Sequence, residues 1–355
     1  MPDSGEALRQ RVIEAFADAT PLRPEGGGSK SFLGASAVGE PLSLREHSGI
    51  ITYEPRELVI RARAGTPLAE IDQALAEHRQ MLAFEPPAFG SDATIGGTIA
   101  CGLSGPRRPW VGSARDFVLG VRIVNGRGDA LHFGGEVMKN VAGYDVSRLM
   151  VGAFGTLGVI LDVSLKVLPR PECELTLTQS RDQSDALRIM NASARLAPLS
   201  AACWHDGLLS IRLSGAESAV IAAADSLGGD CVADGDAFWV AVKEHRHAFF
   251  QPALAGESPL WRLSVAPTSA PLALSGAQFI DWGGAQRWWL SDAPAERIRA
   301  VAESAGGHAI RFRGGAGDTA VFHPLPTPLM ALHKRLKQAF DPGRILNPGR
   351  QYAEL

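Results

Sequence analysis

The sequence predicts an α+β protein built from two regions of different texture. In residues 1–172, helices and strands are separated by three glycine-rich loops, at 26–28, 91–105 and 152–158. From Cys173 to about residue 323, shorter strands and helices alternate without such loops. This second pattern predicts an antiparallel sheet with helices packed on one face.

Composition excludes several classes of function. A chain of 355 residues can form two or three domains. Its net charge of −3, with 21% charged residues, leaves no broad basic field for nucleic acid. No apolar run reaches the roughly 18–20 residues that span a bilayer. The N-terminus carries acidic residues and lacks the apolar core of a signal peptide. We expect a cytoplasmic protein, and peripheral association with the inner membrane through a complex stays open.

The cysteines argue against a metal centre. Cys101, Cys173, Cys203 and Cys231 lie far apart and form no CxxC pair. Iron–sulfur and structural zinc sites usually have closer ligand spacing. We expect reduced and mostly buried thiols, so an organic cofactor would have to carry any electrons.

The first loop follows an amphipathic helix predicted over residues 5–19. Consecutive glycines at 26–28 free backbone N–H groups to point at one anion, and Ser29 and Lys30 add side-chain donors. The pattern matches neither a Walker loop nor GxGxxG. A flexible surface loop is the alternative.

The second loop is the most glycine-rich stretch. Residues 58–64 predict a strand, after which Thr66 as N-cap and Pro67 at the first helical position predict a helix. Thr94–Ile95 then predicts a buried strand that runs into a loop at Gly96–Gly97. Bare N–H groups there would suit a planar or phosphorylated cofactor. A tight turn between two core strands is the alternative.

The third loop stands between a hairpin and a strand. Residues 117–124 and 130–133 predict two strands joined by a turn. A short helix is predicted over 146–150. Residues 159–167 alternate in polarity, which predicts a half-buried antiparallel strand.

The second region has the following expected elements. Strands are predicted at 174–178, 208–213, 238–242, 259–265, 286–290 and 308–313, and helices at 184–196, 216–227, 293–304 and 328–340. Trp288 and Trp289 are adjacent in a predicted strand, so their side chains point to opposite faces. Unless helices or loops cover the second face, one indole is expected to be exposed and to anchor a partner subunit. The alternative is that they fill the region's own core.

Five motifs in order resemble the vanillyl-alcohol-oxidase/PCMH-type FAD-binding family. They are GGGSKSFLG, ATIGG, KNVAGYD, GTLGVILDVSLKVLP and DPGRILNPGR. Within that family they are most similar to the FAD-binding subunits of bacterial glycolate oxidases. The resemblance covers residues 24–170 and the last ten or so, and it is weak through 173–323. It implies a PCMH-type FAD-binding domain of two α+β subdomains at 1–172, a smaller α+β cap domain at 173–323, and a C-terminal helix and tail at 324–355 that return to the FAD-binding domain.

The resemblance also implies roles for individual residues. The pyrophosphate of FAD would be held by Gly26, Gly27, Gly28, Ser29 and Lys30. The pyrophosphate and flavin would lie along Thr94, Gly96, Gly97 and Thr98. The adenosine end would be bounded by Gly155, Gly158, Val159 and Ile160, and Asn347 would reach the flavin edge.

Departures from the family pattern bear on chemistry. The first loop has no histidine, so non-covalent FAD is expected. Phe154 stands where hydroxyacid dehydrogenases of the family often have glutamate. Residues 300–330 lack the family's histidine-and-acid segment, so no catalytic residue is assigned. His245 and His247 are a poor substitute, because residues two apart on a helix do not face the same way. His323 is expected to be structural or solvent-facing.

The implied function is that of the FAD-binding subunit of a glycolate (2-hydroxyacid) oxidase complex. Electrons would pass from the hydroxyacid through flavin to a partner, either a sister flavoprotein or an iron–sulfur subunit. The alternative is a non-catalytic relay or scaffold, with the chemistry on the sister flavoprotein. A cell-wall UDP-sugar reductase shares the architecture, but the DPGRILNPGR tail argues against it.

Overall fold

The computed structural model describes residues 4–36, 38–135, 145–195, 198–315 and 320–355. The chain forms two compact units. The first comprises Met1–Ser104, Gly112–Pro169 and Pro324–Leu355, and the second Gly105–Val111 and Arg170–His323. Most of the KNVAGYD motif, residues 139–144, lies outside the described residues.

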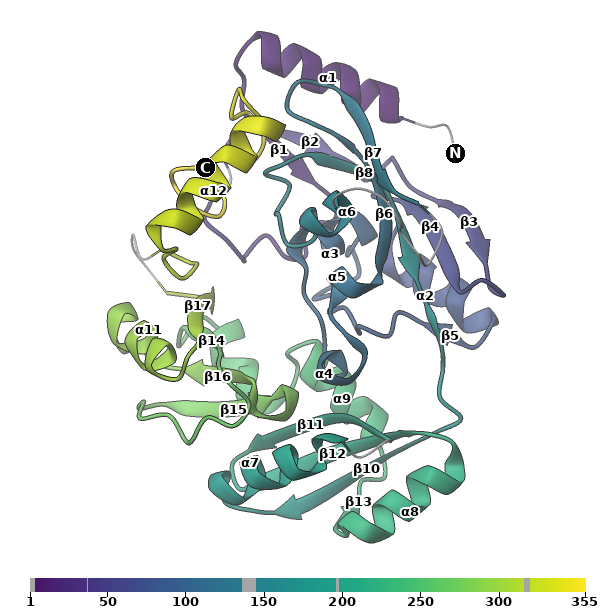
Figure 1. The fold of residues 1–355 in the computed structure, drawn as a ribbon, viewed down its shortest axis with the longest axis vertical. Helices are drawn as coiled ribbons and strands as arrows, with labels where there is room; N and C mark the ends of the chain where they lie inside the picture. Colours follow the sequence, from purple (N-terminus) through teal and green to yellow (C-terminus); the bar gives the residue numbers. More distant parts are fainter. Residues whose placement is uncertain (1–3, 37, 136–144, 196–197, 316–319) are drawn as a thin grey trace. The chain divides into compact units, whose positions relative to one another are not determined.

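The first unit is built around a five-stranded antiparallel sheet of order β3-β4-β8-β6-β7 (Figure 1). Two further two-stranded sheets pair β1 with β2 and β5 with β9. The strands are β1 Leu22–Glu25, β2 Glu40–Ser43, β3 Ile50–Glu54, β4 Val59–Arg63, β5 Gln80–Met81, β6 Val118–Val124, β7 Ala130–Gly134, β8 Val159–Lys166 and β9 Leu168–Pro169. The helices are α1 Gly5–Ala17, α2 Leu68–Glu77, α3 Ile95–Cys101, α5 Ala114–Phe117, α6 Val146–Leu149 and α12 Thr327–Phe340.

The central strand β8 is more buried than the sequence predicts. Its polar residues Asp162 and Ser164 are 1% and 3% exposed, so the expected half-buried strand is wrong. The Asp162 carboxylate accepts from Arg61 of β4 at 3.0 Å and from Arg122 of β6 at 2.6 Å. Because both flanking strands supply a cation, a carboxylate can lie in the middle of the sheet.

Two other local predictions have different outcomes. The hairpin is confirmed, since β6 pairs antiparallel with β7. Thr66 is not the N-cap of α2, because Pro67 occupies that position. The Thr66 hydroxyl instead accepts from the Gly49 N–H at 2.9 Å and donates to the Arg63 carbonyl at 2.7 Å.

The second unit is an eight-stranded antiparallel sheet of order β13-β10-β12-β11-β15-β16-β14-β17. Its strands are β10 Cys173–Ser180, β11 Leu199–His205, β12 Leu208–Gly215, β13 Asp230–Cys231, β14 Leu260–Ser264, β15 Ala277–Asp281, β16 Gln286–Leu290 and β17 His308–Arg313. Its helices are α4 Arg108–Val111, α7 Gln183–Ala192, α8 Glu217–Leu227, α9 Gly235–Lys243, α10 Gln251–Leu254 and α11 Ala295–Ser304, with 3-10 turns η1 Ser193–Arg195, η2 Ala248–Phe250 and η3 Trp282–Gly284. The sequence did not predict β11 or β15.

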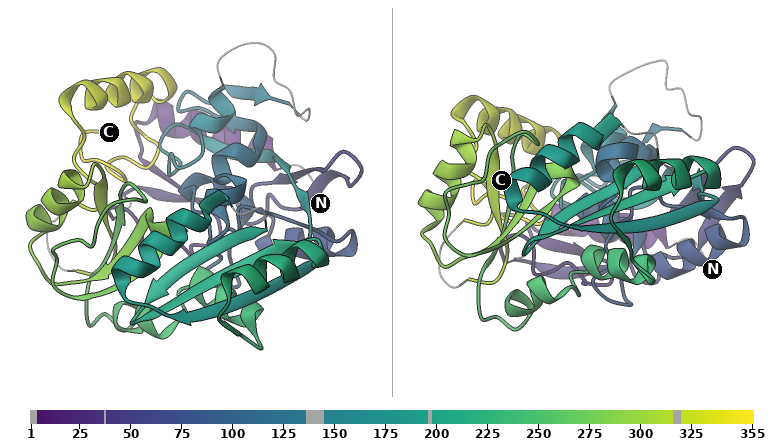
Figure 2. Two further views of the ribbon diagram at one scale, coloured as in Figure 1. Left: turned by 60° about the horizontal axis from the view of Figure 1, so that its bottom comes forward. Right: turned by 90° about the horizontal axis from the view of Figure 1, so that it is seen from below.

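Helices cover both faces of this sheet, so the expectation of one covered face is wrong. Figure 2 (left) shows α7 and α8 across one face. On the other face lies α9, whose Trp239 indole donates to Thr176 of β10 at 3.0 Å, whereas the neighbouring Leu177 belongs to the core under α7 and α8. Residues 238–242, predicted as a strand, lie in α9, because the Asp234 side chain caps this helix by accepting from the Ala237 N–H.

Both adjacent tryptophans are consequently buried. Trp288 is 4% exposed and contacts Phe312, with ring centroids 4.8 Å apart. Trp289 is 1% exposed, packs in the core under α11, and donates its indole N–H to the Ser275 carbonyl at 2.9 Å. The exposed indole expected as a partner anchor is therefore wrong, and both side chains fill the unit's own core.

The four thiols differ in their exposure. All four cysteines are free, but only Cys203 is buried and Cys231 is exposed, so "mostly buried" is wrong. Among the described residues, no group of three His, Cys, Asp or Glu side chains could hold a metal. None of the helices in those ranges has the length and apolar character needed to cross a bilayer.

We predict that Trp289→Ala lowers the free energy of unfolding by about 3–5 kcal/mol, because truncating a buried tryptophan leaves a cavity. Urea unfolding followed by circular dichroism measures the change. Leu208→Ala is the control, since Leu208 is 45% exposed and should change stability by less than about 0.5 kcal/mol. Equal midpoints for the two variants would contradict the prediction.

Candidate functional site

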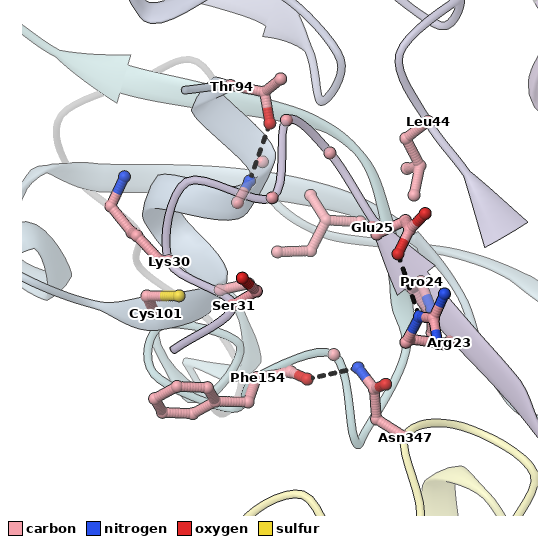
Figure 3. Close-up of a pocket in the computed structure, with 18 of the residues that line it drawn as sticks. Arg23, Pro24, Glu25, Lys30, Ser31, Leu44, Thr94, Cys101, Phe154 and Asn347 are labelled. Atoms are coloured by element: carbon pink, nitrogen blue, oxygen red, sulfur yellow. Dashed lines mark hydrogen bonds and ion pairs between the residues drawn. The ribbon is translucent and has the colours of Figure 1, made fainter. Parts of the chain in front are cut away.

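The sequence-predicted site residues meet at one cavity of about 560 Å³ within the first unit (Figure 3). Thr98 and Val159 are the exceptions, since both are buried but neither lines the cavity. The predicted residues that line it are Gly26, Gly27, Gly28, Ser29, Lys30, Thr94, Gly96, Gly97, Gly155, Gly158, Ile160 and Asn347. Four stretches distant in sequence are thus brought together.

The first glycine loop is packed against a neighbouring segment. A Cβ on Gly27 would lie 1.4 Å from the Asp92 carbonyl oxygen, and one on Gly26 would lie 2.1 Å from Thr94 Oγ1. Arg45 donates to the carbonyls of Gly26 and Gly27 at 3.3 and 3.0 Å. The loop is therefore held in place from both sides, unlike the free surface loop of the alternative interpretation.

This loop presents unsatisfied donors to the cavity. The main-chain N–H groups of Gly27, Gly28 and Ser29 donate to no group within the part of the chain that the structure describes. Lys30 is 6% exposed, and its ammonium donates to the Ala88 carbonyl at 3.2 Å. Successive free N–H groups beside a cation form an anion-binding concavity.

The second glycine stretch is a helix, so both the strand-and-loop prediction and the tight-turn alternative are wrong. Thr94 is the N-cap of α3, and its hydroxyl accepts from the Gly97 N–H at 3.3 Å. Glycine is needed at position 96 because a Cβ there would lie 2.5 Å from the Ala64 Cβ of the underlying segment. Gly96 therefore serves close helix packing, whereas Gly97 and Cys101 of the same helix line the cavity.

The opposite wall joins the third glycine loop to the C-terminal tail. Asn347 is 5% exposed and donates from Nδ2 to the Phe154 carbonyl at 2.8 Å (Figure 3). Its Oδ1 atom accepts no hydrogen bond from any described residue. Gly155, with φ of +68°, brings the loop so near that an added Cβ would lie 3.0 Å from Asn347 Nδ2. A buried carbonyl oxygen in a cavity wall needs a donor, and a ligand can supply it.

Sequence reasoning missed several lining residues. Arg350 lines the cavity and ties the tail to the first loop, donating to the carbonyls of Ser31 and Leu33 at 2.9 and 2.6 Å. Cys101 lies one turn after Gly97, which the helical period would have revealed had the helix been predicted. Burial raises the pKa of its thiol, and Lys30 and Arg350 offset part of that rise. Arg23 and Glu25 also line the cavity, paired at 3.0 Å.

The histidines considered from sequence lie in the second unit and do not form an acid–base cluster. His245 follows the end of α9 and is 4% exposed, stacked on Phe250 with centroids 4.0 Å apart. His323 pairs with Glu303 at 3.0 Å and accepts from the Ala309 N–H at 3.3 Å, which makes it structural, as expected. The cavity lining contains no histidine among the described residues.

Comparison with known proteins agrees with this geometry. A family model described as an FAD binding domain matches residues 1–134. The chain is 50% identical to glycolate oxidase subunit GlcE of Escherichia coli K12, over 99% of each chain. It is 32% identical to glycolate oxidase subunit GlcD of Bacillus subtilis, over 52% of this chain and 41% of that one. It is also 32% identical to D-2-hydroxyglutarate dehydrogenase of Xanthomonas citri, over 48% and 36% of the two chains.

The fold of both units is similar to that of one solved structure. An alkyldihydroxyacetonephosphate synthase superposes with a TM-score of 0.67, covering 98% of this chain and 76% of that one. At 16% identity this match bears on the fold alone. The predicted α+β class with an FAD-binding domain is confirmed.

Proposed function

The chain belongs to the family of glycolate oxidase subunit GlcE, and from that premise we propose that it is the FAD-binding subunit of a glycolate-oxidising complex. The observation that carries this proposal is the run of N–H groups at Gly27, Gly28 and Ser29 that have no acceptor among the described residues, in the wall of a cavity of about 560 Å³. A phosphorylated cofactor satisfies such donors without many buried cations. FAD bound there supplies a hydride acceptor and an electron carrier.

Individual residues then have proposed tasks. The N–H groups of residues 27–29 and the Lys30 ammonium hold the diphosphate. Asn347 Oδ1 accepts a hydrogen bond from the cofactor, since it has no donor among the described residues. Thr98 and Val159 support neighbouring segments from the core, because neither lines the cavity. The first unit is the FAD-binding domain with the tail, and the second is the cap domain.

The proposed partners are a sister flavoprotein and an iron–sulfur subunit. No metal-holding cluster occurs in the described ranges, so electrons need another carrier after flavin. Peripheral attachment at the inner membrane would come through these partners. The alternative, a non-catalytic relay or scaffold, is favoured by one observation: the described cavity lining lacks a histidine to act as general base.

We expect glycolate to bleach the flavin of the complex under anaerobic conditions, measured as loss of absorption at the flavin maximum. The same titration on the purified chain alone separates the two functions. Bleaching of the chain alone supports a catalytic subunit, whereas bleaching only after partner addition supports the relay. D-lactate is the second substrate to test, and failure of both acids to bleach the assembled complex would contradict the proposal.

We predict that FAD is bound non-covalently. The cavity contains the Cys101 thiol but, in its described lining, no histidine, and burial raises the pKa of that thiol, which disfavours the nucleophilic thiolate. Acid precipitation should leave the flavin in the supernatant. Flavin retained in the pellet would refute the prediction, and its loss in Cys101→Ala would then identify the attachment atom.

We predict that Gly97→Leu abolishes FAD binding while the protein stays folded. Gly97 is helical, and an added Cβ would contact only Thr94 Oγ1, at 3.3 Å, so a longer side chain extends into the cavity. Flavin content of the purified variant is the measurement, with circular dichroism as the folding check. Gly97→Ala is the matched control and should retain most of the flavin. Normal flavin content in Gly97→Leu would contradict the placement of the cofactor.

A further inference from the structure

Lys337 is the one buried residue of helix α12 among those that the structure describes. Its side chain is 2% exposed, and its ammonium lies 2.9 Å from Asp341 Oδ2, a carboxylate that is fully buried. The ammonium also donates to the carbonyls of Thr156 at 2.9 Å and Leu346 at 2.7 Å. Its three N–H donors therefore have three acceptors, which is what a buried ammonium requires.

The two carbonyls belong to the two segments that form one wall of the cavity. Thr156 lies in the third glycine loop, next to Gly155, and Leu346 directly precedes Asn347. The Asn347 side chain joins the same two segments by donating to the Phe154 carbonyl at 2.8 Å. Lys337 and Asn347 thus bridge one pair of segments from opposite sides, Lys337 from the core and Asn347 from the cavity.

Asp341 completes the arrangement. Its carboxylate accepts from the N–H groups of Ile345 and Leu346 at 3.1 and 2.8 Å, which fixes the turn before Asn347. After this turn, the main-chain N–H of Asn347 donates to the Leu22 carbonyl at 2.9 Å. Leu22 begins the strand that leads to the first glycine loop. One buried ion pair therefore orders three of the segments around the cavity.

Burial lowers the pKa of Lys337, and the neighbouring Asp341 offsets part of that shift. An ion pair at this depth is weak evidence for stability, since well-packed apolar residues often stabilise as much. The geometry of this pair says more about its role than its energy does, because the Lys337 ammonium directs its three N–H donors at three fixed acceptors. This points to a task in positioning.

We propose that Lys337 is a positioning residue for the cofactor: it sets the place of Asn347 Oδ1, the buried acceptor in the cavity wall, and so the affinity for FAD. This inference rests on the proposed function, because it takes FAD to be the ligand of this cavity. Lys337 itself does not line the cavity. It acts through Asn347 and the loop at 154–156.

A double-mutant cycle on FAD affinity tests the proposal. Flavin is removed from the chain, and the Kd for FAD is measured by quenching of flavin fluorescence for the wild type, Lys337→Met, Asn347→Ala and the double variant. Each single change should raise Kd about tenfold, the scale of one lost hydrogen bond to a cofactor. If Lys337 acts through Asn347, the double variant is also about tenfold weaker, not the roughly hundredfold of independent effects.

Two further variants serve as a control and as an alternative background for this test. Lys334→Met, at an exposed lysine on the same helix, should leave Kd unchanged. If Lys337→Met fails to fold because Asp341 is left as an unpaired buried charge, the cycle is run in the Asp341→Asn background, where no such charge remains. A Kd unaffected by Lys337→Met, or multiplicative effects in the double variant, overturns the inference. Failure of the wild type to bind FAD instead overturns the proposed function.

Discussion

The close approach of glycine main chain to neighbouring segments around the cavity is the constraint on which the first unit depends. At four positions an added Cβ would meet a neighbouring segment: Gly26 at Thr94, Gly27 at Asp92, Gly96 at Ala64 and Gly155 at Asn347. Only glycine lets these segments come so near. The closeness places main-chain N–H groups in the wall, where a side chain would otherwise keep the ligand at a distance. This wall is therefore formed in part at positions that carry no side chain.

Two groups of buried charges also hold segments of the first unit together. Asp162 lies between Arg61 and Arg122 in the middle of the sheet, and the Lys337–Asp341 pair lies beneath the tail. Both connect elements distant in sequence, which hydrophobic contact alone does not place in a fixed register. In the sheet, the two arginines that bind Asp162 are partly open to water, with side chains 24% and 30% exposed. Lys337 and Asp341 are both buried, so this pair tolerates less displacement than Asp162 and its two arginines.

Sequence reasoning succeeded where local chemistry decides the outcome. The glycine runs at 26–28 and 152–158 mark two segments that reach the cavity, whereas Asn347 was placed beside them by the resemblance of the DPGRILNPGR tail and not by its local sequence. It failed where tertiary packing overrides local preference. Thr94–Gly97 has the β-branched residues of a strand, yet it becomes a helix because Gly96 fits against Ala64. Lys337 could not be found at all, since nothing in a basic amphipathic helix marks the lysine that faces inward.

The tryptophan pair failed for a different reason. Alternation along β16 correctly puts Trp288 and Trp289 on opposite faces, but exposure depends on what covers each face. The missing information was the segment that follows the helix at 235–243, because the rings of His245 and Phe250 in that segment contact Trp288. The exposure of this indole therefore depends on residues far from it in the sequence, which alternation along one strand does not reveal.

The assignment of Gly105–Val111 to the second unit means that the chain passes between units at 104–105, 111–112, 169–170 and 323–324. Within that unit Arg107 binds Glu174 and Trp110 packs against the core under α7 and α8. Neither unit is a continuous stretch of polypeptide, so neither can be completed during synthesis before the other has begun. The cavity wall also joins Asn347 and Arg350 to the first glycine loop, and Arg350 donates to the carbonyl of Leu33, 317 positions earlier in the chain. Closing this wall therefore requires two segments that lie far apart along the chain to meet.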